Sequence, residues 1–374
     1  MVDQLPADDI LPGRDFILIP LIVLAVTAAF LGFSDIAAGI LFPERGRFTC
    51  GMTDPQDGAP RQKPNCTTSY KNPEGPLVEY QFNECGYRSH HSCGPKPSGT
   101  LRVVLLGTSM TMGLYVRDDE TFASRTEELL RKKCDRPVEI QNMGAMMVLA
   151  GEPKLIKEAL GLSPDVIVLA VAPFDIQESE APTKGAHPKA KSAFVQAKLA
   201  WYKLKLRIRN SRFVLAAAHF MLLDEQMLYQ VFLSNGTSRD VMTYPPTAAG
   251  ERRYAEFSAT LEQIRTQLHG TGVPLVVMAV PNRIAAAMVS NHSLVEGIDP
   301  DWFGRHISEI AAENGAISID VTPDFAKVAH AENLFYPVDN HPTGDAHAII
   351  AEALVDRLTD GSIPQMAACH STRP

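Results

Sequence analysis

A serine near one end of the chain and an Asp-x-His pair near the other could together perform nucleophilic chemistry. Ser109 follows Gly107 and Thr108 directly after a strongly apolar run, and Asp339 and His341 stand two residues apart. A serine hydroxyl becomes a nucleophile when a histidine takes its proton and a carboxylate orients that histidine. Each piece alone is uninformative, because Gly-Thr-Ser is usually only a loop and Asp often caps a helix. Their order in the chain makes them a candidate catalytic site.

Alternating strand-like and helix-like segments must position these residues. Strands are predicted at 101–106, 138–142, 165–172, 273–280 and 316–321, and helices at 120–133, 247–269, 301–314 and 346–358. Short apolar strands separated by helices are typical of a parallel sheet that is covered on both faces. Ligands bind beyond the carboxyl ends of such strands, where Ser109 would stand. We therefore expect an α/β fold with a central parallel sheet.

Several short motifs resemble those of the SGNH (GDSL-type) hydrolases, over roughly residues 80–358. The matching segments are Gly107-Thr108-Ser109 for the GDS block (with Thr in place of Asp), Asn142-Met143-Gly144 for the second block, and Phe335 through His347 for the last. A lead-in containing Asn83, Gly86, Tyr87 and Arg88, followed by Pro97-Ser98-Gly99, is similar to that of membrane-anchored bacterial members. The resemblance implies a three-layer α/β/α sandwich (SGNH/flavodoxin-like). It also implies that Ser109 is the nucleophile, that His341 is the general base and that Asp339 orients the imidazole.

The resemblance further implies an oxyanion hole, usually formed by the serine N–H, a glycine N–H and an asparagine side chain. Gly144 and Met147 are the candidates near the second block, and Met147 stands at the usual glycine position. The asparagine normally closes a G-x-N-D-like turn, which here reads Ala172-Pro173-Phe174-Asp175, so we expect Asp175 at the asparagine position. An ionised carboxylate would repel the oxyanion, and losing one donor costs roughly 10²–10³ in rate.

The N-terminal segment is long and apolar. From Phe16 to Phe33 it holds no charged residue, and an apolar run resumes after Asp35 and ends at Phe42. This length is sufficient to span a bilayer with some tilt. A buried core helix rarely stays apolar on all sides over such a length, and the acidic residues before the run lack the basic region of a cleaved signal peptide. We expect an uncleaved membrane anchor at 1–44.

Cysteine placement suggests the compartment. Four cysteines fall in a Pro/Gly-rich connector at 45–98, namely Cys50, Cys66, Cys85 and Cys93. They indicate two disulfides in an oxidising compartment, although the sequence does not give the pairing. The last two, together with His90 and His91, could instead bind zinc, but their spacing matches no standard zinc module. Cys134 and Cys369 could pair to tie down the tail at 363–374, or each could be free.

A basic segment interrupts the α/β pattern of the expected main domain at 99–362. Thr183–Arg212 holds nine Lys or Arg residues and no Asp or Glu, and an apolar stretch follows at Phe213–Leu223. We expect a helical insertion at about 178–245. It could lie on anionic lipid near the anchor, or it could be a solvated basic helix followed by a core helix. His219 in this stretch and His347, one turn after His341, are expected to be packed histidines rather than catalytic bases.

Composition narrows the function further. The 374 residues are 45% hydrophobic and 21% charged, which indicates a packed core and excludes a disordered, collagen-like or small disulfide-rich protein. A formal net charge of −8 disfavours nucleic-acid binding. No Walker, Rossmann or metalloprotease motif occurs, so we expect no cofactor and no metal.

The sequence therefore predicts a membrane-anchored, single-pass serine esterase or O-acyltransferase with its main domain outside the cytoplasm. It would transfer an acyl group, by resemblance acetyl, from or to a cell-envelope or exported glycan through an acyl-serine intermediate. The alternative is a catalytically weak or inactive SGNH-like domain that binds glycan or partner proteins in an envelope complex, which the residue at position 175 favours.

Overall fold

The computed structural model describes residues 14–55, 58, 60–146, 149–176, 211–234 and 239–369. The chain divides into two compact units, residues 1–43 with 187–220 and residues 44–186 with 221–374. Met147 and most of the expected insertion lie outside the described residues.

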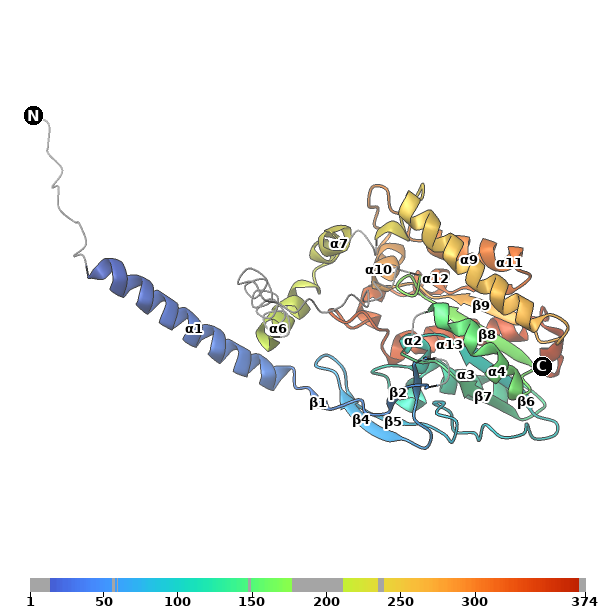
Figure 1. Ribbon diagram of the computed structural model, residues 1–374. Helices are drawn as coiled ribbons and strands as arrows, with labels where there is room; N and C mark the ends of the chain where they lie inside the picture. The colour runs from blue at the N-terminus through green and yellow to red at the C-terminus, as the bar shows by residue number, and fades with distance from the viewer. Residues whose placement is uncertain are drawn as a thin grey trace, which may run out of the picture. The chain divides into compact units, whose positions relative to one another are not determined.

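A five-stranded sheet forms the centre of the larger unit (Figure 1). Its strands are β6 (Leu101–Leu106), β7 (Val138–Asn142), β8 (Val166–Val171), β9 (Leu275–Ala279) and β10 (Ile317–Asp320). All neighbouring strands are parallel, in the order β7-β6-β8-β9-β10, which is the 2-1-3-4-5 order of flavodoxin-like folds. Every residue of β6, β8 and β9 is buried, as expected for strands that are covered on both faces. The predicted α/β fold with a central parallel sheet is confirmed.

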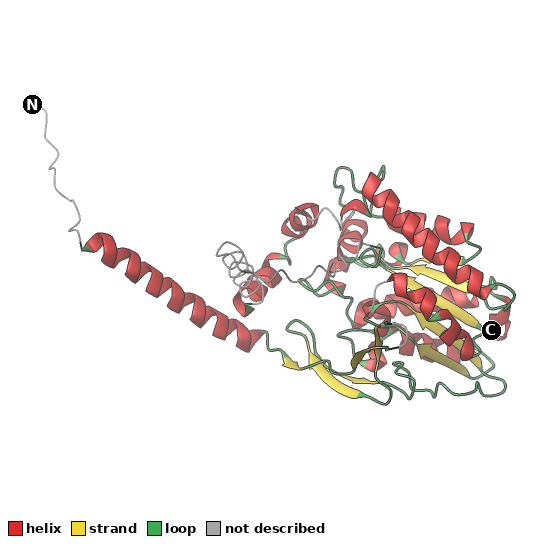
Figure 2. Cartoon of the chain, in the orientation of Figure 1, coloured by secondary structure: helices red, strands yellow, loops and turns green. Residues whose placement is uncertain are grey.

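Helices cover both faces of this sheet (Figure 2). One core contains the inward faces of α4 (Ile156–Gly161), α9 (Ala248–Leu268) and α11 (Trp302–Glu313), and the other those of α3 (Phe122–Lys133), α12 (Thr322–Phe325) and α13 (Gly344–Thr359). Along β6, Val104 and Leu106 join the first core while Val103 and Leu105 join the second. This alternation follows from the two-residue period of a strand.

Shorter elements complete the larger unit. They are α2 (Ser109–Met112), α7 (Glu225–Ser234), α10 (Arg283–Asn291) and the 3₁₀ helices η1 (Asp118–Glu120), η2 (Leu149–Lys154), η3 (Ala331–Leu334) and η4 (Pro364–Cys369). α10 contributes to both cores.

The residues between the apolar helix and the sheet form two small antiparallel sheets. β1 (Arg45–Gly46), β4 (Thr67–Lys71) and β5 (Leu77–Gln81) form one, and β2 (Gly51–Thr53) and β3 (Pro60–Gln62) form the other. In β5, Val78 and Tyr80 are buried while their neighbours Leu77, Glu79 and Gln81 are exposed, which is the pattern of a half-buried strand. The segment expected to be a connector is therefore a folded part of the larger unit.

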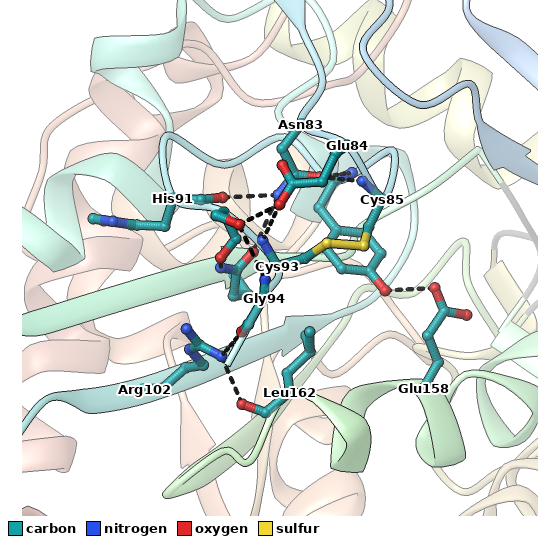
Figure 3. The surroundings of a disulfide bond; sticks show 12 residues. Asn83, Glu84, Cys85, His91, Cys93, Gly94, Arg102, Glu158 and Leu162 are labelled. Carbon is teal, nitrogen blue, oxygen red and sulfur yellow. Dashed lines mark hydrogen bonds between the residues drawn. A yellow bond between two sulfur atoms is a disulfide. The ribbon is translucent and has the colours of Figure 1, made fainter. Parts of the chain in front are cut away.

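Three disulfides are present: Cys50–Cys66, Cys85–Cys93 and Cys134–Cys369. Figure 3 shows the second, around which Asn83 accepts hydrogen bonds from the Cys85 and Tyr87 N–H groups at 3.0 Å and donates to the His91 carbonyl at 2.9 Å. Because Cys85 and Cys93 are bonded to each other, they lack the thiolates that the alternative zinc site would need. Among the described residues, no three His, Cys, Asp or Glu side chains are grouped to hold a metal.

The smaller unit contains α1 (Asp15–Leu41) and α6 (Arg212–Met221). By length and composition α1 can cross a membrane, although a signal sequence near the N-terminus passes the same test. Asp35 of α1 accepts hydrogen bonds from the Ser211 hydroxyl at 2.6 Å and the Phe213 N–H at 3.1 Å. The ring of His219 lies 4.9 Å from that of Phe42, so this histidine is packed against an aromatic side chain, as expected.

Candidate active site

Ser109 stands at the carboxyl end of β6, as the first residue of α2. Gly107 makes the turn between them, with a φ of +145°. A Cβ at this position would lie 2.1 Å from Thr111 Oγ1 and 2.9 Å from the Ala170 carbonyl oxygen, so only glycine fits. Strands β6 and β8 flank the point where the strand order switches direction, which is where open α/β sheets bind ligands.

The structure brings Ser109, His341 and Asp339 together. Ser109 Oγ lies 2.8 Å from His341 Nε2, and His341 Nδ1 is hydrogen bonded to Asp339 Oδ1. A carboxylate only accepts hydrogen bonds, so Nδ1 carries the imidazole proton and Nε2 is left to accept the serine proton. This is the connectivity that a serine nucleophile requires.

A tight turn between η3 and α13 carries both Asp339 and His341. The Tyr336 N–H donates to the His341 carbonyl at 3.0 Å, and the Asn340 N–H donates to the Tyr336 carbonyl at 2.8 Å. Asn340, between the two catalytic candidates, has a φ of +67°, a conformation that asparagine tolerates better than most residues. The turn lets residues two positions apart face each other.

Two aromatic rings flank the imidazole of His341. The Tyr115 ring lies 5.3 Å from it edge-on, and the Phe174 ring lies 6.0 Å from it. Tyr115 is held in the left-handed region at a φ of +66°, because its N–H donates to the Tyr80 hydroxyl at 2.8 Å and its carbonyl accepts from the Tyr336 hydroxyl at 3.0 Å. Burial and the nearby Asp339 charge raise the pKa of the Tyr115 phenol, so that phenol stays neutral.

Arg88 supports the segment that follows the nucleophile. Its guanidinium, which is buried, donates to the carbonyls of Met112, Gly113 and Val116 at 3.0, 2.7 and 2.8 Å. These carbonyls lie at and just beyond the end of α2, where helices leave acceptors unsatisfied. In the sequence, Arg88 stood out only because its segment resembles the lead-in of other proteins. Its contacts with three carbonyls explain why a buried cation is placed there.

Gly144 is placed beside α2, but its N–H is already used. It donates to Asn142 Oδ1 at 3.0 Å, and the Asn142 amide donates to the Thr111 carbonyl at 2.9 Å. A Cβ on Gly144 would lie 2.4 Å from the Met112 nitrogen, so this glycine permits close packing of the two segments. The Ser109 N–H remains as a candidate oxyanion donor, since N–H groups in the first turn of a helix have no partner within it. Met147 lies outside the described residues.

Asp175, expected at the asparagine position of the oxyanion hole, is hydrogen bonded within the serine turn. Its Oδ1 accepts from the Thr108 hydroxyl at 2.6 Å and its Oδ2 accepts from the Ala172 N–H at 2.8 Å, so it braces the serine turn from within. Aligned letter by letter with G-x-N-D, the turn Ala172-Pro173-Phe174-Asp175 puts Phe174 at the asparagine position, and the Phe174 ring is the group that lies beside His341. Both carboxylate oxygens of Asp175 thus have partners within the turn, and its expected place in the oxyanion hole stays a prediction.

Two buried titratable groups near the site have shifted pKa values. Burial raises the pKa of Asp175 to about 7, and burial together with the Asp175 charge raises that of Glu152, on η2, to about 8. Nothing in the sequence marks Glu152.

His347 is fully buried, accepts the Phe122 N–H at 3.0 Å, and has its pKa lowered by burial to about 3. It is therefore neutral and packed, in agreement with the sequence-based expectation.

A hollow of about 180 Å³ opens beside the Asp339–His341 turn. Its lining includes Phe174, Pro337 and Asn340 from the site, and Leu222, Leu228, Val231, Phe232, Asn282, Arg283 and Ile284 from α7, α10 and adjoining residues. The lining is mostly apolar and also contains the polar residues Asn282, Arg283 and Asn340.

No protein-family model and no curated protein matches the sequence. Similar solved structures include LAE5, described as an α/β hydrolase enzyme from the metagenome of Lake Arreo, Spain, which is 13% identical with a TM-score of 0.41, covering 72% of this chain and 97% of that chain. The acetylxylan esterase Axe2 from Geobacillus stearothermophilus is 13% identical with a TM-score of 0.39, and the match covers 68% of this chain and 92% of that chain.

A putative lipolytic protein of the G-D-S-L family from Desulfitobacterium hafniense is 11% identical with a TM-score of 0.37, covering 68% of this chain and 97% of that chain. These similarities are remote, and the chemistry proposed below rests on the geometry of Ser109, Asp339 and His341 in this chain.

Proposed function

We propose that this protein is a serine esterase or acyltransferase with Ser109 as nucleophile, His341 as general base and Asp339 as the group that orients the imidazole. The observation that supports this most strongly is the 2.8 Å contact between Ser109 Oγ and His341 Nε2, with Asp339 bonded to the opposite ring nitrogen. A serine activated in this way acts as a nucleophile, and its oxygen attacks the acyl carbon of an ester.

The reaction follows from this arrangement. Ser109 Oγ forms a bond to the ester carbonyl carbon while its proton passes to His341 Nε2, and the carbonyl oxygen becomes an oxyanion. The oxyanion collapses, the bond to the alcohol oxygen breaks, and His341 returns the proton to the departing alcohol. Water or a sugar hydroxyl then attacks the carbonyl carbon of acyl-Ser109 while His341 accepts its proton. The bond between that carbon and Ser109 Oγ breaks, His341 returns the proton to Oγ, and the acid or the new ester leaves. Asp339 stabilises the imidazolium that forms in both halves.

Within the part of the chain that the structure describes, few donors face the expected position of the oxyanion. The Ser109 N–H at the start of α2 is the donor closest in the chain to the reacting oxygen, whereas a ring rather than an amide follows β8 at Phe174. Removing one donor from an oxyanion hole lowers the rate by roughly 10²–10³. We therefore expect slow turnover relative to an enzyme with a full set of donors.

For the substrate, we propose a short acyl ester, of which acetyl on a glycan is the first choice. The hollow beside the site is about 180 Å³. An apolar cavity of about 150 Å³ accommodates benzene, so a two-carbon acyl group fits with room to spare. The lining also contains Asn282 and Asn340, whose side chains are hydrogen bonded within the chain to Ala285 and Val338.

We also propose that α1 anchors the protein in a membrane with the larger unit outside the cytoplasm. Support comes from the length and apolar character of α1 and from three disulfides, which persist in oxidising compartments. Resistance of the full chain to alkaline carbonate extraction, with the larger unit digestible by protease added from outside, would support this topology. Release of a shortened soluble chain would identify α1 as a cleaved signal instead.

A fluorophosphonate probe tests the catalytic proposal. We expect the full chain in detergent to be labelled at Ser109, with no labelling of Ser109→Ala, and to release acetate from p-nitrophenyl acetate and from an O-acetylated polysaccharide. A folded chain that is neither labelled nor active would remove the proposal.

Phe174 favours a second candidate, a binding domain with little or no turnover, because it supplies no hydrogen bond at the asparagine position. Such a domain would bind acetylated glycan equally well in the wild type and in Ser109→Ala, with no ester cleavage in either.

A further inference from the structure

The turn between β4 and β5 lies against the turn that carries Asp339. Glu74 accepts the Val338 N–H at 3.1 and 3.2 Å through its two carboxylate oxygens, and it accepts the Asp339 N–H at 3.0 Å. Asn72 donates from Nδ2 to Asp339 Oδ2 at 3.4 Å. These contacts join residues that are 264 to 267 positions apart in the chain.

We propose that Glu74 and Asn72 are positioning residues for the Ser109–His341–Asp339 triad, so that the N-terminal hairpin is a working part of the active site. This inference rests on the proposed serine chemistry. Neither residue touches the reacting atoms; both act through Asp339.

Glu74 fixes the backbone on which Asp339 stands. Two consecutive N–H groups of the turn point at one carboxylate, and hydrogen bonds to an ionised acceptor are roughly twice as strong as those between neutral groups. On the neighbouring residue, the buried Arg283 donates to the Pro337 carbonyl at 2.9 Å. The turn is thus held by α10 at residue 337 and by the hairpin at residues 338 and 339.

Asn72 fixes the side chain of Asp339. One carboxylate oxygen of Asp339 bonds His341 and the other accepts from Asn72. The Asn72 amide can face only one way, because its Oδ1 accepts the Glu74 N–H at 2.9 Å and its Nδ2 must then point to Asp339. Asn72 is 7% exposed, so little water competes for this contact.

The hairpin itself is anchored to the site at two further places. The buried Tyr80 of β5 accepts the N–H of Tyr115, whose ring lies edge-on to His341. Gly75 packs so closely that a Cβ there would lie 3.3 Å from the Tyr336 ring. The Cys50–Cys66 disulfide ties the residue that precedes β4 to Cys50, outside the hairpin. A catalytic group is held well when its supports are themselves rigid.

The test compares Glu74→Ala, Glu74→Gln and Asn72→Ala with the wild type in the full chain, using p-nitrophenyl acetate. We expect Glu74→Ala to lower kcat by roughly 10–100-fold with KM nearly unchanged, since a small displacement of a catalytic group costs up to about 10²-fold. Glu74→Gln keeps an acceptor oxygen and the same shape, so it should stay within about fivefold of the wild type. Asn72→Ala should lower kcat and leave KM unchanged, because it removes a hydrogen bond to Asp339 and no contact with the substrate.

Glu79→Gln is the matched control, because Glu79 is exposed on the same hairpin and its side chain accepts from Gln81. It should change neither kcat nor KM. Thermal melts identify any variant that fails to fold, and if Glu74→Ala is one of them, Asn72→Ala carries the comparison.

Amide hydrogen exchange of peptides covering residues 335–343 gives a readout that does not depend on activity. Faster exchange there in Glu74→Ala, together with the fall in kcat and recovery in Glu74→Gln, would support the inference. Unchanged exchange, or a full kcat in Glu74→Ala and Asn72→Ala, would overturn it. A folded wild type without turnover would overturn the proposed function, and the exchange comparison would still decide whether the hairpin holds the turn.

Discussion

Ser109 and His341 are 232 positions apart in the chain, and their Oγ and Nε2 atoms lie 2.8 Å apart. The first follows a central strand of the sheet and the second stands just before the last long helix. In the proposed mechanism this convergence makes the serine reactive, because the nucleophile and its base come from two distant segments of the chain. Replacing either residue should therefore abolish the same step.

Ser109→Ala and His341→Gln should each lower esterase activity by at least about 10³-fold, since residues that act as a unit fail together. The double variant should be no worse than either single one. Rates on p-nitrophenyl acetate measure this, with His306→Gln on the surface helix α11 as a histidine control. Multiplying effects in the double variant would show that the two residues act independently, contrary to the proposal.

Phe174→Asn should raise kcat, by up to roughly 10²-fold, because it places an amide beside His341 where a ring now lies and so offers the oxyanion a further donor. Phe174→Leu removes the same ring without adding a donor and serves as the control. Equal activity in the two variants would mean that position 174 does not face the developing charge.

The sheet and the triad could be predicted because each leaves a local trace. Continuous apolar strands mark a sheet buried on both faces, and Ser109 and His341 lie in short recognisable motifs. The sequence did not reliably predict the side chain that faces the site after β8. A shift of one residue in the alignment of this turn replaces Phe174 with Asp175.

The contribution of the N-terminal hairpin leaves no such trace. Glu74 and Asn72 stand in a polar turn of the kind that any hairpin contains, and their partner Asp339 lies more than 260 positions away. Four nearby cysteines indicated disulfides and compartment, but not that the segment folds against the active site. The contacts of Glu74 and Asn72 with the turn that carries Asp339 are seen only in the tertiary structure.

Removing disulfides should separate stability from catalysis. Loss of either Cys50–Cys66 or Cys134–Cys369, by paired serine substitutions, should lower the free energy of unfolding by about 2–5 kcal/mol. Only the first should also lower kcat, because Cys66 adjoins the strand that leads to Glu74. Denaturant melts and steady-state rates below the melting range measure the two effects. An equal loss of kcat in both variants would argue against a specific link between the hairpin and the triad.

The buried carboxyls Glu152 and Asp175 should make the protein less stable as the pH rises. Burial, and for Glu152 also the charge of Asp175, raises their pKa values in the folded state from 4.5 to about 8 and from 3.8 to about 7. At a pH between the pKa of each carboxyl in the unfolded state and its pKa in the folded state, the folded state binds more protons than the unfolded state. The stability that these two carboxyls contribute is therefore fully present below about pH 4 and is lost progressively up to about pH 8.

Glu152→Gln keeps the shape of the side chain and cannot ionise, so its melting temperature should fall less than that of the wild type between pH 5 and pH 8.5. At pH 8.5 the variant should melt roughly 3–6 °C higher than the wild type, which corresponds to about 1–2 kcal/mol. At pH 5 the two should nearly coincide. Glu128→Gln is the control, because its exposed ion pair with Lys132 lowers the pKa of Glu128 and its titration falls below this range. Parallel curves for wild type and Glu152→Gln would mean that Glu152 is not buried as a neutral acid.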